Sequence, residues 1–458
     1  MVFQNNVLSG AAGSGTTVHT IDQSIRFNSA DSAYMHRTPS SSGNRKTFTS
    51  SFWVKFGDLT DCALPFPSVL QNANYGAFLS SGIIQFFIYY SGSWQGQLYT
   101  NRVFRDPAAW YHFVIVVDTT NATPTERVRI YVNGQRETSF STENYPNQNQ
   151  DTDWNNSGEK MGIGVSANGF SSSFGEYYAA EMVFIDGTAY GPENFGEYNS
   201  SGIWIPKDVS GLSFGTNGFH IDGRDSSDLG DDESGQGNDF TVVNLASNDQ
   251  MSDSPTTNWC VMSSLLNNGC TYTNGNLEVA PPNLQSTHRL VLPTMGILPS
   301  DTNKYYWEIT YLASDNSSSV NMLGVAGLDR GDNPASATLN GDGDGYGLGY
   351  NTSTSNIYAG GNWTANGSPT WSGGFTAGAI YGVAYDGSTK RLYFYENNSA
   401  LNSGNHFATY TGSAPLGPGA SMYVSPSSSK LIFNMGANGF TYTPPTGYVA
   451  VNTTNLGS

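Results

Sequence analysis

Positive charge is scarce in this chain of 458 residues. It has 19 Lys and Arg against 37 Asp and Glu, a formal net charge of −18, and no basic cluster. Proteins that grip a phosphate backbone carry clustered Lys and Arg, so we expect no nucleic-acid partner. The acidic balance leaves uncharged partners such as neutral glycans open.

Long apolar runs and cysteines are also scarce. No stretch approaches the roughly 18 apolar residues of a membrane span, so we expect no membrane insertion. The first residues, MVFQNNVLSG, lack the basic and apolar regions of a signal peptide, which favours synthesis in a cytoplasm. The three cysteines Cys62, Cys260 and Cys270 are too few and too dispersed for a disulfide framework. Cys260 and Cys270 could pair, or all three could be free thiols.

The common catalytic signatures are missing as well. There is no nucleophile elbow, no P-loop and no H-E-x-x-H. Glu176, Glu181 and Asp186 are spaced by five, which on a regular strand places neighbours on opposite faces rather than as a catalytic pair. The six histidines show no ligand pairing, and His112 is expected to be satisfied inside the core. We therefore expect a protein that is not an enzyme.

What the chain has is Gly (53 residues), aromatic residues (13%) and strand patterns. In Trp110–Gln135, an almost wholly apolar segment (YHFVIVVD) suits a strand buried on both faces, and RVRIYV alternates before the Asn133-Gly134 turn. A second hairpin pattern recurs at Ile380–Asn397. Short strands at this density, with one possible helical turn near Pro192, predict an all-β protein.

Two segments resemble known folds. The phrases SFWVK, WYHFVIVVD, IYVNG and AEMVFIDG occur in the order seen in laminin-G-like domains, over about residues 20–205. YYWEIT, the Asp386–Asn398 hairpin and FNMGANGFTYTPPTGY resemble a SPRY domain, over about residues 270–450. Both resemblances imply concanavalin A-like antiparallel β-sandwiches, or jelly rolls.

The resemblances divide the chain into five parts. We expect an N-terminal arm, a laminin-G-like sandwich, an extended acidic connector, a SPRY-like sandwich and a short tail, at residues 1–20, 21–217, 218–268, 269–451 and 452–458. Within the connector, Gly230–Phe240 (GDDESGQGNDF) and Asp253–Asn258 (DSPTTN) resemble phrases that follow laminin-G-like domains in tailed-phage proteins.

Two loops have the composition of sugar sites, where aromatic faces meet C–H surfaces and amides bind hydroxyls. One contains Tyr89 and Trp94, and the other contains Asn362, Trp363 and Trp371. The alternative is that these tryptophans plug a sandwich end or an oligomer interface.

Two acidic turns have the oxygen-rich composition of Ca²⁺ loops. They are Asp342-Gly343-Asp344 and Asp231–Asp239, and neither completes an EF-hand. The alternative is a pair of solvated acidic turns without metal.

The resemblance implies a virion protein, such as a tail fibre, tailspike or head fibre. Its arm would attach to other virion proteins, its sandwiches would bind host surface glycans, and it would be a homotrimer. The alternatives are a decoration or adaptor protein that binds no glycan, a polysaccharide-degrading enzyme, and a SPRY-type peptide binder.

Overall fold

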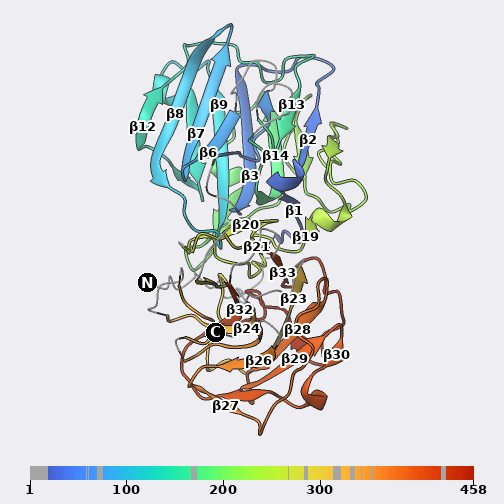
Figure 1. Cartoon of the computed structure of the whole chain (residues 1–458). Coiled ribbons are helices and arrows are strands. Elements are labelled where there is room, and N and C mark those ends of the chain that lie inside the picture. Colours follow the sequence, from blue (N-terminus) through green and yellow to red (C-terminus); the bar gives the residue numbers. More distant parts are fainter. Residues whose placement is uncertain are drawn as a thin grey trace. The chain divides into compact units, whose positions relative to one another are not determined.

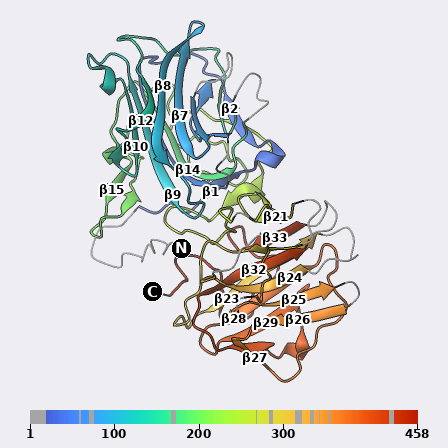
Figure 2. The ribbon, with the colours of Figure 1, turned by 60° about the vertical axis from the view of Figure 1, so that its left-hand side comes forward.

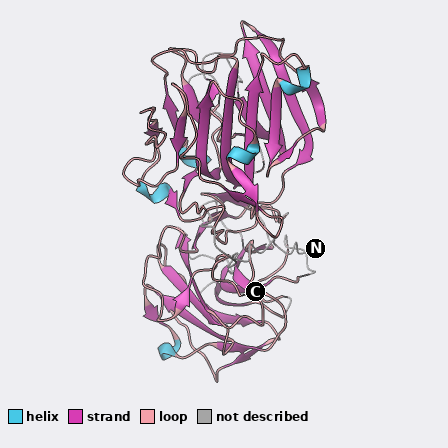
Figure 3. Ribbon diagram, turned by 180° about the vertical axis from the view of Figure 1, so that it is seen from behind, coloured by secondary structure: helices cyan, strands magenta, loops and turns pink. Residues whose placement is uncertain are grey.

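The structure is a computed structural model that describes residues 19–57, 59, 61–69, 76–166, 173–266, 268–282, 287–312, 321–330, 336–341, 343–351, 354–423 and 430–457. The described helices are all three-residue 3-10 segments, so the fold is all-β as predicted (Figure 3). They are η1 (Ser29–Asp31), η2 (Pro124–Glu126), η3 (Pro192–Asn194), η4 (Ser247–Asp249) and η5 (Asn402–Gly404). Within these ranges, no helix is long and apolar enough to cross a membrane.

The described residues form two compact units, which divide between Thr257 and Asn258 (Figure 1). The larger sheet of the first unit has the order β11-β10-β9-β3-β14-β1-β19, with β17 also on β14. Its strands are β11 (Gln135–Arg136), β10 (Val128–Val132), β9 (Trp110–Asp118), β3 (Thr47–Phe56), β14 (Tyr177–Asp186), β1 (Ser24–Phe27), β19 (Gln250–Met251) and β17 (Phe219–Ile221).

Two smaller sheets make the opposite layer of this sandwich. The five-stranded sheet runs β12 (Phe140–Asn144), β8 (Ser93–Val103), β7 (Ile83–Tyr90), β6 (Gly76–Ser80) and β4 (Cys62–Ala63). The four-stranded sheet runs β18 (Thr241–Val243), β2 (Tyr34–Arg37), β13 (Met161–Ile163) and β5 (Ser68–Val69). One apolar cluster joins both layers, and it includes Phe52, Phe113, Phe86 and Met161.

The hairpin pattern at Trp110–Gln135 folds as predicted. Strands β9 and β10 pair in antiparallel register, with Val117 opposite Val128. Asn133 and Gly134 both have positive φ, of 48° and 77°, which suits the tight turn between β10 and β11. The apolar run in β9 is buried on both faces, because Phe113 faces the sandwich core while Val114 joins a second cluster.

That second cluster lies on the outer face of the eight-stranded sheet. Val114 and Val183 of the sheet pack there with Phe195, Val209 and Phe214, which come from the segment after β14. The hairpin of β15 (Gly196–Tyr198) and β16 (Trp204–Pro206) belongs to the same segment. The larger sheet is therefore covered on its outer face by this segment, in addition to the sandwich core on its inner face.

Most of the acidic stretch expected as an extended connector, up to Thr257, is instead folded into the first unit, and its last residues from Asn258 belong to the second unit. Its strands β17, β18 and β19 pair with β14, β2 and β1. The carboxylates that suggested a solvated linker accept hydrogen bonds within the unit: Asp232 accepts from the backbone N–H groups of His220, Ser234 and Asn238. Local composition could not show this, because the partners are supplied by strands far along the chain.

The two phage-like phrases are built around such contacts. At Gly230 a Cβ would lie 2.0 Å from the carbonyl oxygen of Phe240, so only glycine fits. In the second phrase, Asp253 forms an ion pair with Lys55 of β3 at 2.7 Å, and the two side chains are 1% and 0% exposed. Trp110 Nε1 donates to the other Asp253 oxygen at 3.0 Å, and Lys55 Nζ lies 5.6 Å from the Tyr178 ring centroid.

The second unit is also a pair of antiparallel sheets (Figure 2). The ten-stranded sheet contains β20 (Thr271–Thr273), β21 (Glu278–Ala280), β33 (Lys430–Asn434), β23 (Lys304–Leu312), β28 (Ile380–Asp386), β29 (Arg391–Glu396), β31 (Ala408–Tyr410), β27 (Trp363–Ala365), β30 (Ser399–Ala400) and β34 (Tyr448–Val449), the last in parallel with β23. The five-stranded sheet contains β22 (His288–Val291), β32 (Leu416–Tyr423), β24 (Asn321–Gly327), β25 (Tyr346–Asn351) and β26 (Thr354–Ala359). The predicted second hairpin is β28–β29.

Removing the carboxylate of Asp253 would leave the ammonium group of Lys55 buried without its partner charge. We predict that Asp253→Ala lowers the free energy of unfolding of the first unit by about 3–5 kcal/mol. Hydrogen exchange of the β3 amides in increasing urea, followed by mass spectrometry, isolates this unit in the full chain.

The control for this prediction is Asp151→Asn, which breaks the exposed Lys46–Asp151 pair of the same unit (3.6 Å, 38% and 41% exposed). Exposed pairs of this kind contribute about 0–1 kcal/mol. Equal effects of the two substitutions would show that the buried pair does not hold the acidic stretch in place.

Candidate functional site

The outer side of the five-stranded sheet carries a cluster of aromatic and amide side chains, which we call the aromatic face. In the cross-strand register, Phe78 lies opposite Gln85, Gln85 opposite Tyr99, and Phe87 opposite Gln97. Inward-facing residues of the same strands, such as Phe86 and Leu98, are buried in the core. The members of the aromatic face are Phe78, Gln85, Phe87, Tyr89, Trp94, Gln97, Tyr99, Thr142 and Asn144.

The rings of the aromatic face touch one another across three strands. Ring centroids are 5.7 Å apart for Phe78 and Phe87, 5.3 Å for Phe87 and Trp94, and 5.1 Å for Trp94 and Tyr89. Tyr99 contacts Phe87 at 5.4 Å. Trp94 is 44% exposed, which makes it the most open aromatic group of this row. The rings thus form a continuous surface with an accessible indole at one end.

A β-bulge places Trp94 on this surface. Ile88 pairs with Gly96 and Tyr89 pairs with Trp94, so Gln95 is the extra residue. Without the bulge, the odd spacing from Trp94 to Gln97 would point the two side chains to opposite faces. The Gln95 amide folds back and donates to Tyr90 O at 3.3 Å and Ser93 Oγ at 2.7 Å, which holds the bulge.

Amide groups beside the rings are available to a ligand. Among the described residues, the side chains of Gln85 and Asn144 make no hydrogen bond, and Gln97 makes only a long one, 3.5 Å, to Tyr99 OH. An amide offers both a donor and an acceptor, which matches a sugar hydroxyl. No member of the aromatic face is charged; the carboxylate of Asp61 accepts from Ser80, beyond Phe78 at the end remote from Trp94.

The sequence predicted two of these residues, and the structure brings Tyr89 and Trp94 together here. Phe78, Phe87, Tyr99 and the amides were not predicted. A usable signal was the strand period of two along IIQFFIYY, which places the polar Gln85 on the same face as Phe87 and Tyr89.

The second predicted sugar loop lies in the second unit and is placed differently. Trp363 is 7% exposed, packs on Tyr346 and Tyr410, and donates its Nε1 to Asp344 O at 2.8 Å. Trp371 is 8% exposed and packs on Phe375. Both indoles therefore lie in the interior of the second unit rather than on its surface. Asn362 donates to Asp344 Oδ1 at 2.8 Å.

Of the two carboxylates predicted to bind Ca²⁺, Asp342 lies outside the described residues. Asp344 is buried, and its Oδ1 accepts from Asn362 Nδ2 and from Tyr410 OH at 2.6 Å. Within the described ranges, no group of three His, Cys, Asp or Glu is gathered that could hold a metal. Calcium binding stays a prediction of the sequence.

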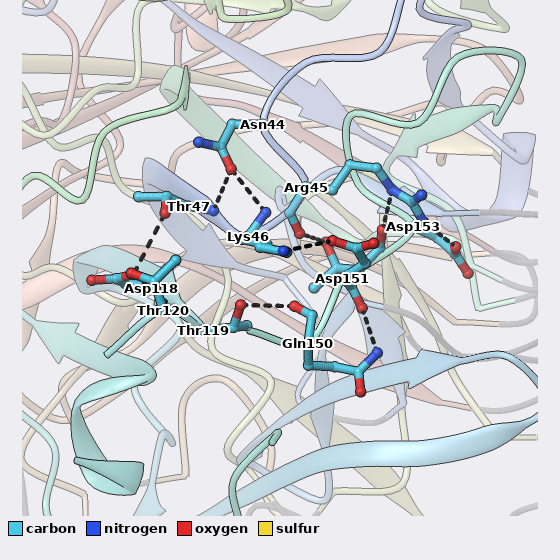
Figure 4. Close-up of polar contacts among 11 residues, drawn as sticks. Asn44, Arg45, Lys46, Thr47, Asp118, Thr119, Thr120, Gln150, Asp151 and Asp153 are labelled. Atoms are coloured by element: carbon cyan, nitrogen blue, oxygen red, sulfur yellow. Dashed lines mark hydrogen bonds and ion pairs between the residues drawn. The ribbon is translucent and has the colours of Figure 1, made fainter. Parts of the chain in front are cut away.

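One edge of the first sandwich gathers several acidic side chains, and the close-up shows how each is engaged (Figure 4). Arg45 pairs with Asp153 at 3.3 Å and Lys46 with Asp151 at 3.6 Å. Asp118 Oδ1 accepts from Thr120 Oγ1 at 2.5 Å and from Thr120 N at 3.2 Å. These carboxylates serve local ion pairs and turns.

A Ser–His contact lies on the outer face of the larger sheet, where Ser51 and His112 border a small cavity. Ser51 Oγ and His112 Nε2 are 2.8 Å apart, and Trp204 Nε1 donates to His112 Nδ1 at 2.9 Å. Indole N–H can only donate, so Nδ1 is the acceptor and the neutral ring carries its proton on Nε2. Nε2–H then donates to Ser51, and His112 cannot accept the serine proton as a general base.

Glu181 also lines this cavity, with Trp53, Val183, Phe195, Pro206, Lys207 and Val209. It sits at a bulge in β14 with φ of 47°, so the assumption of a regular strand fails at this residue. Its carboxylate contacts His220 Nε2 at 2.7 Å. It is the only carboxylate among the described residues that line this cavity, which supplies no acid–base pair for glycoside cleavage.

Residues 28–175 match the family model Laminin_G_3, described as the concanavalin A-like lectin/glucanases superfamily. The match covers about a third of the chain and contains the whole aromatic face. No curated protein matches the chain.

Several solved structures are similar in part. Domains LG4-5 of the mouse laminin alpha1 chain share 9% identity over 96% of this chain and 99% of that chain, with a TM-score of 0.31. The SPRY domain of human HERC1 shares 14% over 36% and 91%, with a TM-score of 0.25. A pentraxin from Limulus polyphemus shares 16% over 38% and 80%, with a TM-score of 0.29. TM-scores this low carry no argument about function.

The two histidines of the larger sheet should titrate in opposite directions. Burial lowers the pKa of His112 from 6.5 to about 3. Burial also opposes protonation of His220, but the hydrogen bond and charge of Glu181, with the charge of Asp222, raise its pKa above 6.5. We predict that His112 keeps a neutral ring with its proton on Nε2 at pH 5, while His220 is already protonated. Nitrogen-15 NMR of the imidazole rings measures both.

The consequence for stability follows from proton uptake. Unfolded His112 takes up a proton below about pH 6.5, whereas the folded residue does so only near pH 3. Lowering the pH from 6.5 to 3 therefore decreases the free energy of unfolding. The His220 contribution is present below pH 6.5 and is lost as the pH rises through its folded pKa. Titration of His112 near 6.5 would contradict the buried Ser51–His112–Trp204 arrangement.

Proposed function

We propose that the protein binds glycans through the aromatic face and does so as a structural component of a phage particle. The observation that carries the first part is the uncharged row of contacting rings beside free amides, with Trp94 open to solvent. Aromatic rings pack on the C–H face of a sugar while amides bind its hydroxyls. The match of residues 28–175 to a lectin and glucanase superfamily supports the same ligand class.

The virion part of the proposal rests on the phrases Gly230–Phe240 and Asp253–Asn258, which resemble those of tailed-phage proteins. Residues 1–20 would attach the chain to other virion proteins, and a homotrimer would multiply weak glycan contacts into avidity. Identification of the chain by mass spectrometry in purified phage particles would support this location. Its absence from particles of a phage that encodes it would contradict the virion role.

We propose binding without catalysis. His112 carries its proton on Nε2, the nitrogen that faces Ser51, so it cannot take the serine proton and activate a nucleophile. Among the described residues that line the cavity, Glu181 has no second carboxylate beside it. Release of reducing ends from a bound polysaccharide would favour the enzyme instead. A decoration or adaptor protein would fold in the same way and show no sugar affinity.

The substitution Trp94→Ala tests the glycan site. We predict that it weakens binding to a glycan recognised by the full chain about tenfold, which corresponds to about 1.4 kcal/mol. The loss follows from removing the most exposed ring of the row. Isothermal titration calorimetry, after a glycan array has identified a ligand, measures the effect.

Tyr198→Ala is the matched control for this substitution. Tyr198 is 48% exposed, comparable with Trp94, and lies on β15 in the same unit but away from the aromatic face. Its loss should leave affinity unchanged. If Trp94→Ala binds as well as the parent chain, the aromatic face is not the glycan site.

A further inference from the structure

We infer that the aromatic face takes a flat, neutral glycan chain of at least three equatorially linked hexose units, rather than one terminal sugar or an acidic polysaccharide. This inference deepens the proposed function and rests on it. It concerns the length, shape and charge of the ligand, which follow from how the rings and amides are spaced on the sheet.

The aromatic face is too long for a single sugar. Its side chains lie at three successive cross-strand positions, which we call rows here. The first row contains Phe78 and Tyr99, the second contains Phe87, and the third contains Tyr89 and Trp94. Rows on one face are two residues apart, so three rows span about 13 Å at roughly 3.3 Å per residue. One pyranose ring can contact only one or two of these side chains, whereas consecutive units of a chain can contact all three rows.

The row of rings is also continuous in the direction that a chain would follow. Successive centroids from Phe78 through Phe87 to Trp94 are 5.7 and 5.3 Å apart, comparable with the length of one sugar unit, and Tyr89 lies beside Trp94 in the same cross-strand pair. The row lies on the outer surface of a sheet rather than in a closed pocket. An equatorially linked chain is a flat ribbon, and its C–H surfaces can follow such a surface where a strongly bent chain cannot.

Charge separates neutral from acidic chains. Each row offers neutral partners only, with Gln85, Gln97 and Asn144 as the amides, and no Lys or Arg that could pair with a uronate or sulfate. The Arg45 guanidinium lies 5.4 Å from the Tyr90 ring centroid, next to the third row, and is already paired with Asp153. The Asp61 carboxylate lies beyond the first row, and the chain as a whole carries −18; both repel an anionic glycan. Neutral amides that match sugar hydroxyls and negative charge that repels anionic chains together favour a neutral ligand.

The probe that tests this inference is the cello-oligosaccharide series from glucose to cellohexaose, titrated calorimetrically into the full chain. We expect affinity to rise at least tenfold from glucose to cellotriose and to change little from cellotetraose to cellohexaose. Trp94→Ala should weaken cellohexaose about tenfold. Phe78→Ala, at the opposite end of the row, should weaken cellohexaose but not cellobiose.

Hexagalacturonate, an acidic chain of matched length, is the charge control and should bind at least tenfold more weakly than cellohexaose at low salt. Because Phe78 is half-buried, near-ultraviolet circular dichroism checks that its variant folds, and the exposed Trp94 variant carries the test if it does not. Glucose binding as tightly as cellohexaose, hexagalacturonate binding more tightly, or no binding of the neutral series would each overturn the inference. Trp94-dependent binding of some other glycan would still leave the proposed function standing, whereas an array without any Trp94-dependent ligand would remove both.

Discussion

Lys55 on β3 and Asp253 lie 2.7 Å apart with both side chains closed to solvent, and the first unit is arranged around that contact. A charge in such a site is tolerated only when its partner and further hydrogen bonds are in place. Trp110 and the Tyr178 ring complete the surroundings. The pair holds Asp253 against the larger sheet, while β17 and β19 of the same stretch extend that sheet and β18 pairs with β2 in the opposite layer.

The two layers of the sandwich are covered to different extents. The larger sheet is covered on both faces, by the core on one side and by residues that follow β14 on the other. The five-stranded sheet is covered on one face only in the part of the unit that the structure describes, and its outer side carries the contacting rings and free amides. The five-stranded sheet is therefore the one that can present side chains to a ligand. The polar groups of the larger sheet form contacts within the unit.

Local patterns were sufficient to predict much of the fold. The apolar run of β9, the alternation in β10 and the Asn133-Gly134 turn depend on neighbours in sequence, and all three form as expected. The role of the acidic stretch depends on Lys55, almost 200 residues away, so composition alone suggested a connector.

The candidate site shows the same division between local and distant information. Trp94 was recognised by its loop composition, but its place beside Phe87 depends on the bulge at Gln95, which period-two reasoning does not anticipate. Trp363 has a similar composition and is buried, because its indole N–H finds the Asp344 carbonyl oxygen. Residue type indicated the chemistry, and strand register decided which side chains meet.

The most direct test of the account is a crystal structure of the full chain with cellohexaose. The account predicts a sugar chain lying across β6, β7 and β8, with consecutive units against Phe78, Phe87 and Trp94 and hydroxyls bonded to Gln85 and Gln97. A sugar bound on the second unit or in a loop at a sandwich end, with the aromatic face empty, would contradict it.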